Sequence, residues 1–172
     1  MVLFGGPRER HGPHHWTERG LPGASSLPMK IYTIGFTKTS AERFFTRLGS
    51  AGVKRVLDVR LNNVSQLAGF AKRDDLRYFL RSICAIDYAH RLDLAPTQDM
   101  LDAYKKDGGS WEDYARRFVG LVAARRVEEA LTRETVDGAC LLCSEHEAHH
   151  CHRRLVAEYL KEQWGDVEIV HL

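Results

Sequence analysis

The chain has 172 residues, the length of one ordinary domain, and can bury a substantial core. Its 25 basic and 23 acidic residues leave a formal charge of +2, too balanced for bulk charge to drive non-specific nucleic-acid binding. No apolar run approaches the ~18–20 residues that span a bilayer, so we expect no membrane partner. The four cysteines come without a secretory signal, which predicts reduced thiols and a cytoplasmic location.

Residues 1–28 differ in composition from the rest of the chain. Frequent glycine and proline interrupt any periodic pattern, and few apolar residues are available for burial. This composition predicts a flexible N-terminal extension. A β-rich run opens after Met29, so residues 29–172 are predicted to form a single domain.

The remaining chain alternates between strand and helix patterns. Strands are predicted at 30–34, 53–57, 86–90, 138–143 and 166–172, and helices at 40–49, 73–84, 96–106, 110–131 and 151–164. Thr39 or Ser40 is expected to cap the first helix, and Ser110 with Asp113 resembles a capping box. This order predicts an α/β fold: a single three-layer, Rossmann-like domain with a mostly parallel five-stranded sheet.

Three predicted strands end in polar or conformationally permissive residues. These ends are Gly35-Phe36-Thr37, Asp58-Val59-Arg60 and Cys143-Ser144-Glu145. Parallel sheets bind ligands beyond the carboxyl ends of their strands, where the strand order reverses. With the strand order 3-2-1-4-5, strands one and four are neighbours at this point, and a polar crevice forms there.

The stretch from Cys140 to Arg154 concentrates cysteine, histidine and arginine between a strand and a helix. Arg60 and Arg153, with the helix N-terminus and the strand end at Gly35 and Thr37, suit an anion such as phosphate. Pairing of the two arginines with nearby carboxylates explains them equally well.

Acid–base and thiol chemistry are also open to this stretch. His152 beside Glu145, with Asp58 orienting, suits proton transfer, although a hydrogen-bonded structural histidine has the same pattern. Cys151 near a helix N-terminus is expected to have a lowered thiol pKa, with Cys143 facing it. Both thiols could instead be small buried hydrophobes, the interpretation that we favour for Cys140 and Cys84.

A metal site is the third chemistry. Cys143, Cys151 and His152 supply three zinc ligands, and Glu145 or His146 a fourth. The spacing C-x7-C-H matches no common structural zinc pattern, and Cys140 and Cys143 point to opposite faces of a strand. We therefore predict no metal and no cofactor, with zinc as the alternative.

An ordered set of short motifs resembles the family described as domain of unknown function 488. The motifs are Ile31-Tyr-Thr-Ile-Gly35, Leu57-Asp-Val-Arg60, Cys143-x-Glu145, Cys151-His152-Arg153 and Ile169-Val-His-Leu172. The resemblance covers about residues 29–172. Members typically carry His-Ser after the first glycine, where this chain has Phe36 and Thr37. The resemblance implies that Asp58, Arg60, Cys151, His152 and Arg153 occupy the family's characteristic positions.

Three functions remain open from the sequence. The leading one is an enzyme that uses His/Glu acid–base chemistry on a phosphorylated, nucleotide or nucleic-acid substrate. The second is a cysteine-dependent sulfurtransferase or redox enzyme, since Asp58-Val59-Arg60 is also reminiscent of rhodanese-like domains. The third is a non-catalytic nucleic-acid-binding module, for which the pairs Arg116-Arg117 and Arg125-Arg126 offer a basic helix face.

Overall fold

The computed structural model describes residues 27–64 and 68–172. Residues 1–26 of the predicted N-terminal extension lie outside the described residues. The strands are β1 (Met29–Gly35), β2 (Arg55–Asp58), β3 (Asp87–His90), β4 (Ala139–Cys143) and β5 (Val167–His171). The helices are α1 (Ala41–Ser50), α2 (Arg73–Cys84), α3 (Gln98–Lys105), α4 (Trp111–Ala124), α5 (Val127–Ala130), α6 (Arg133–Val136) and α7 (His152–Trp164).

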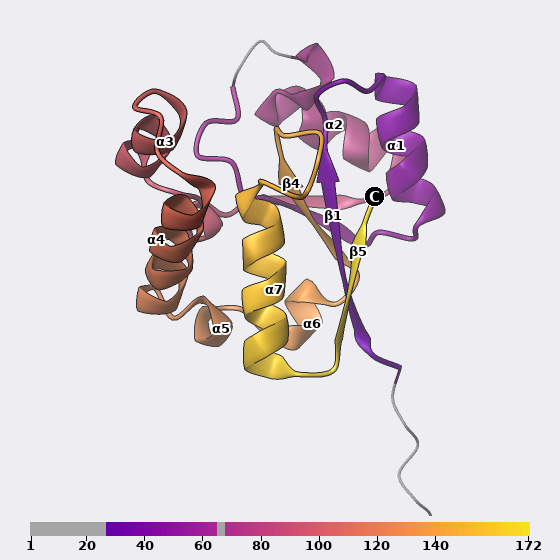
Figure 1. Ribbon diagram of the computed structural model, residues 1–172. Coiled ribbons are helices and arrows are strands. Elements are labelled where there is room, and N and C mark those ends of the chain that lie inside the picture. The colour runs from indigo at the N-terminus through magenta and orange to yellow at the C-terminus, as the bar shows by residue number, and fades with distance from the viewer. Residues whose placement is uncertain (1–26, 65–67) are drawn as a thin grey trace, which may run out of the picture.

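All five strands pair in parallel, in the order β3-β2-β4-β1-β5. Figure 1 labels β4, β1 and β5 of this sheet. The predicted α/β class and parallel sheet are confirmed, but the expected order 3-2-1-4-5 is wrong. β4 lies between β2 and β1, and all five of its side chains are buried, as expected in a parallel sheet that helices cover on both faces.

Two apolar cores cover the two faces of the sheet. One contains Phe44 and Leu48 of α1 with Leu76 and Leu80 of α2. The other contains residues of α4 and α7 packed on alternate strand residues, as the two-residue period of a strand requires. Figure 1 shows α1 and α2 on one side of the sheet, with α4 and α7 on the other. Among the described helices, none combines the length and apolar composition needed to cross a bilayer.

The predicted helix caps are partly confirmed. Ser40 accepts from the backbone N–H of Arg43, and Ser110 accepts from that of Asp113. The helix predicted at 110–131 is wrong at its C-terminal end, because Arg126 has φ of 50° and interrupts it after α4. The helix predicted from 96 begins at Gln98, capped by Thr97.

Candidate functional site

Two cysteines and a histidine meet at the carboxyl edge of the sheet. Cys143 ends β4, Cys151 is the residue before α7, and His152 opens α7. Their ligand atoms, two sulfurs and a ring nitrogen, all lie within 4.8 Å of one another. The Cys143 Sγ is 3.7 Å from His152 Nδ1. We call these three residues the thiol centre.

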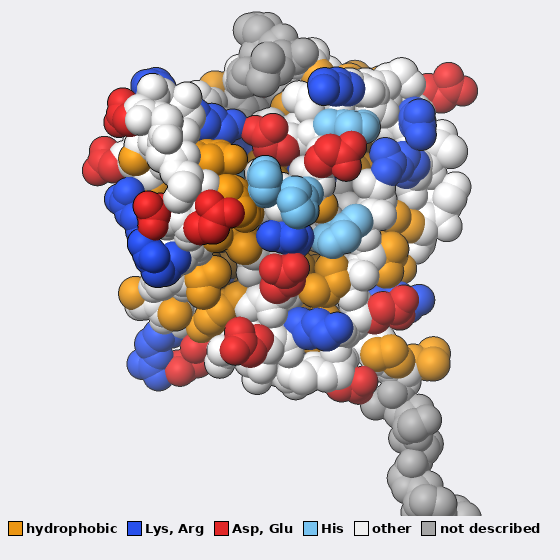
Figure 2. Space-filling model, in the orientation of Figure 1, with side chains coloured by type: hydrophobic (Ala, Val, Ile, Leu, Met, Phe, Trp, Pro, Cys, Tyr) orange, Lys and Arg blue, Asp and Glu red, His pale blue; other side chains and the backbone are white. Residues whose placement is uncertain are grey.

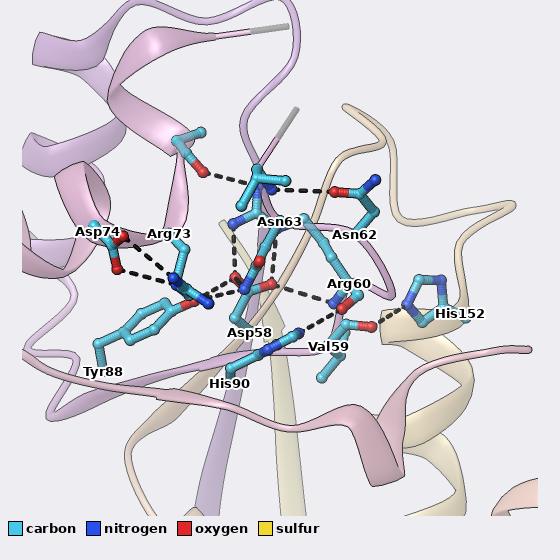
Figure 3. A network of polar contacts seen from close by, with 12 residues as sticks. Asp58, Val59, Arg60, Asn62, Asn63, Arg73, Asp74, Tyr88, His90 and His152 are labelled. Carbon is cyan, nitrogen blue, oxygen red and sulfur yellow. Dashed lines mark hydrogen bonds and ion pairs between the residues drawn. The ribbon is translucent and has the colours of Figure 1, made fainter. Parts of the chain in front are cut away.

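The imidazole of His152 is oriented by β2. Its Nε2 lies 2.8 Å from the backbone carbonyl oxygen of Val59 (Figure 3). A carbonyl oxygen only accepts, so Nε2 carries the hydrogen and donates it. Nδ1, which faces Cys143, is then the nitrogen that can take up a proton from the thiol. The ring therefore has the tautomer that a base for Cys143 needs.

The environment favours a thiolate at Cys143. The pKa of the Cys143 thiol lies well below its usual value, chiefly because the Cys151 thiol donates a hydrogen bond to it. His152 and the backbone N–H of Glu145 lower it further, against the opposing effect of burial. The pKa of His152 is raised: burial lowers it, but the Cys143 thiolate and the Val59 carbonyl outweigh burial. The pair therefore favours thiolate and imidazolium.

The other three cysteines do not have lowered thiol pKa values. The expected lowering of the Cys151 pKa is wrong: this pKa is raised, because Cys151 donates a hydrogen bond to Cys143 and is buried. Cys143 has the lowered pKa instead. Cys140 packs in the core on the opposite face of the sheet from Cys143. Burial raises the pKa of both Cys140 and Cys84.

Asp58 and Arg60 form a closed ion pair rather than an open anion site (Figure 3). Arg60 donates from Nε and Nη2 to the two oxygens of Asp58, at 2.7 and 2.6 Å, and from Nη1 to the Ala71 carbonyl. Tyr88 and Asn63 donate to the same carboxylate. Since Asp58 is used in this way, it does not orient His152, and Val59 does so instead.

Arg153 braces the loop between β4 and α7. Its Nη1 and Nη2 donate to the carbonyl oxygens of Glu145 and His146, and Nη1 also lies 3.3 Å from Cys151 Sγ. Thr37 holds the same loop, donating from its hydroxyl and its backbone N–H to the Ser144 carbonyl. These contacts place the Glu145 N–H beside Cys143.

Gly35 allows the loop to approach β1. A Cβ at this position would lie 1.8 Å from the Glu145 carbonyl oxygen, so any side chain there displaces the loop. Gly35 and Thr37, predicted to bind an anion, therefore have an observed role as contacts that position the backbone after Cys143.

The Glu145 carboxylate points to α3 and not to His152. It pairs with Lys105 Nζ at 2.6 Å, and within the described residues no hydrogen bond joins it to His152. Lys105 and Glu145 border a hollow of about 140 Å³ above the thiol centre. Its walls include the aromatic side chains of Tyr104, Trp111, Tyr114 and His150.

Three of the four arginines of the basic face expected on the long helix make contacts with other groups. Arg125 donates to the carbonyl oxygens of Leu92, Asp93 and Ala95. Arg126 pairs with Glu129, and Arg116 pairs with Asp113. The side chains of Arg116 and Arg126 nevertheless remain exposed in these pairs.

Cys143, Cys151 and His152 are also the group among the described residues whose spacing could hold a metal ion. Two thiolates and an imidazole suit a soft or borderline ion such as zinc. Neither Glu145, bound to Lys105, nor the exposed His146 belongs to this group.

Sequence reasoning missed several residues of the site. The Val59 carbonyl carries no side-chain signal, and its place depends on β2 lying beside β4. Lys105, Tyr104 and Trp111 come from the α3–α4 region, far from the motifs in sequence. The aromatic spacing of Trp111 and Tyr114 was the one available signal, since residues three apart share a helix face.

A comparison with known protein families identifies the family of this chain. A family model described as "Domain of unknown function DUF488" matches residues 40–160. No curated protein and no solved structure matches the chain. The match includes every member of the thiol centre and the Asp58–Arg60 pair.

Proposed function

Since the chain belongs to the DUF488 family, whose description names no activity, we propose a function from the thiol centre: a cysteine-dependent enzyme of the sulfurtransferase or redox type. In this proposal Cys143 is the nucleophile and His152 is its proton acceptor. The observation that carries it is the 3.7 Å contact between Cys143 Sγ and His152 Nδ1, at the base of a hollow. The Val59 carbonyl fixes the imidazole in the required tautomer.

The second thiol favours sulfur chemistry. The Cys143 thiolate attacks one sulfur of a substrate disulfide, forming a protein–substrate S–S bond and breaking that of the substrate. The leaving thiolate takes the proton held on His152. Cys151 then loses its proton to solvent and attacks Cys143 Sγ. This step releases, as a thiolate, the half of the substrate that was bonded to Cys143. The substrate disulfide is reduced, the protein dithiol is oxidised, and an external dithiol must return the protein to its starting state.

The acid–base function on an anionic substrate has weaker support at the crevice. The guanidinium of Arg60 is satisfied by Asp58 and the Ala71 carbonyl. Glu145 is bound to Lys105 and makes no described hydrogen bond to His152. The two groups that such a mechanism needs most are therefore engaged elsewhere.

Alkylation by iodoacetamide tests the proposal, with Cys84 as an internal control. Cys84 is partly exposed whereas Cys143 is 5% exposed, so labelling controlled by access alone modifies Cys84 first. A thiolate at Cys143 reverses this order, and we expect it to react at least about tenfold faster than Cys84 near pH 7. Mass spectrometry of peptides after timed quenching measures both rates.

The variant His152→Gln is the matched test of the base. It keeps a polar side chain but cannot accept the thiol proton, so labelling of Cys143 should slow to about the rate of Cys84. In the wild-type protein the Cys143 rate should be nearly flat from about pH 7 to pH 9, while the Cys84 rate rises. If Cys143 labels more slowly than Cys84 at every pH, or only after a chelator removes tightly bound zinc, the thiolate proposal is wrong.

A further inference from the structure

A second hollow lies between the β4–α7 loop, the end of β5 and Arg47 of α1. It has a volume of about 460 Å³ and is lined by three arginines and three histidines: Arg47, Arg153, Arg154, His146, His149 and His171. Figure 2 shows histidine side chains gathered with Lys and Arg over α7 and the preceding loop. Among these residues, Arg153 is the one whose side chain has a described hydrogen bond to the thiol centre, at Cys151 Sγ.

The positive charge of Arg153 is buried without a carboxylate. The residue is 1% exposed, and its hydrogen-bond partners are two backbone carbonyl oxygens and a thiol. Its Nε is buried with no partner in the described structure. Buried charges are normally paired with an opposite charge, but no carboxylate of the described residues forms an ion pair with Arg153. The charge therefore acts on the adjoining hollow through its field.

The other charged groups around the hollow leave it positive. Arg47 of α1 has no ion pair among the described residues. Arg154 shares its charge with Glu158 at 3.6 Å. The acidic groups on the rim are Glu147, which is 83% exposed beside His146, and the carboxylate of Leu172. Neither of them lies in a described ion pair with an arginine of the hollow.

We propose that this hollow binds a phosphate group, held by Arg47 and Arg154 and stabilised by the buried charge of Arg153. The guanidinium groups of Arg47 and Arg154 belong to α1 and α7, so they reach the anion from two walls. Planar guanidinium donors match the oxygen geometry of phosphate. The site is separate from the thiol centre, and its existence does not depend on the proposed enzyme activity.

The pKa of His171 is sensitive to the same arginine charges. Its Nδ1 lies 2.7 Å from the Thr33 hydroxyl, and burial together with the nearby charges of Arg153 and Arg154 lowers its pKa, while Glu158 opposes them. An anion bound between these arginines offsets their repulsion. Binding is therefore expected to raise the pKa of His171, which a purely structural role for the arginines does not predict.

The test is calorimetric titration of the full chain with inorganic phosphate at constant ionic strength. We expect measurable binding below about 10 mM phosphate and roughly tenfold weaker binding by Arg47→Ala and by Arg154→Ala. Arg43→Ala is the matched control, because Arg43 is exposed on the same helix and does not line the hollow. A histidine NMR titration with and without phosphate measures the pKa of His171.

A labelled single-stranded oligonucleotide of about 12 nucleotides distinguishes a backbone phosphate from a free one. Oligonucleotide binding that requires Arg47 and is displaced by inorganic phosphate supports the site with a phosphodiester as its ligand. Phosphate binding alone, with the same dependence on Arg47, supports it with a small phosphate compound. The proposal is wrong if neither probe binds, or if Arg43→Ala weakens binding as much as Arg47→Ala does.

Discussion

Two buried arginines, Arg60 and Arg153, lie near the same edge of the sheet and are used in opposite ways. Arg60 is 4% exposed and bonds to both oxygens of Asp58. Arg153 is 1% exposed and bonds to loop carbonyl oxygens. The first is a neutral pair that fixes the end of β2. The second fixes a loop and leaves a net positive charge beside a hollow.

The difference shows that an arginine in a crevice is not by itself an anion site. Asp58 and Arg60 are two residues apart, so the carboxylate that neutralises Arg60 is supplied locally. Glu145 could have done the same for Arg153, but its side chain pairs with Lys105. Arg153 therefore keeps its charge, and four predictions test this contrast.

The largest effect is expected for Arg60→Met. Removal of the guanidinium leaves the Asp58 carboxylate, which is 0% exposed, without its opposite charge. We expect a loss of about 3–5 kcal/mol in the free energy of unfolding, measured by urea denaturation. Arg73→Met, which breaks an exposed pair with Asp74, is the control and should change little. A loss below about 1 kcal/mol for Arg60→Met would show that the pair is not buried as described.

Gly35→Ala tests the close approach of the loop that Arg153 braces. The new Cβ meets the Glu145 carbonyl oxygen at 1.8 Å, so the loop must shift. We expect a loss of about 1–3 kcal/mol and slower alkylation of Cys143, because the Glu145 N–H moves away from its sulfur. Gly120→Ala in α4, where a Cβ meets nothing within 4 Å, should instead stabilise by about 1 kcal/mol. Unchanged stability and labelling in Gly35→Ala would contradict the described loop.

Arg153→Met should cost less than Arg60→Met. The substitution leaves two carbonyl oxygens without hydrogen-bond donors, but no buried carboxylate loses its partner. We expect a loss of about 1–2 kcal/mol by the same urea measurement. A cost equal to that of Arg60→Met would mean that a carboxylate neutralises Arg153 in solution, and the comparison between the two arginines would fail.

The smallest effect concerns pH. The pKa of His171 is lower in the folded protein, so the unfolded chain takes up a proton first as the pH falls. The stability linked to His171 is therefore present above its unfolded pKa of about 6.5 and is lost as the pH drops through the folded pKa. Wild-type protein should lose more stability between about pH 7 and pH 5 than His171→Gln does. Equal losses for the two proteins in urea titrations at both pH values would contradict the lowered pKa of His171, which burial causes first and the charges of Arg153 and Arg154 add to.

The sequence by itself determined the element types and much of the site. Apolar periodicity separated strands from helices, and Ser40 and Ser110 marked two helix starts through their hydroxyl acceptors. The polar residues after β2 and β4 identified the edge of the sheet where the thiol centre lies, because parallel strands bring their carboxyl ends together. The proximity of Cys143, Cys151 and His152 follows from a loop that joins β4 to α7.

Only the tertiary structure decided how these residues are used. The order β3-β2-β4-β1-β5 sets β2 against β4 and brings the Val59 carbonyl to His152, a contact between residues 93 positions apart. The partners of Arg60, Arg153 and Glu145 depend on which groups are near when the chain is packed. The energy of an ion pair decreases as the distance between its two charges grows. The sequence therefore shows which charges are present, but not which of them remain unpaired.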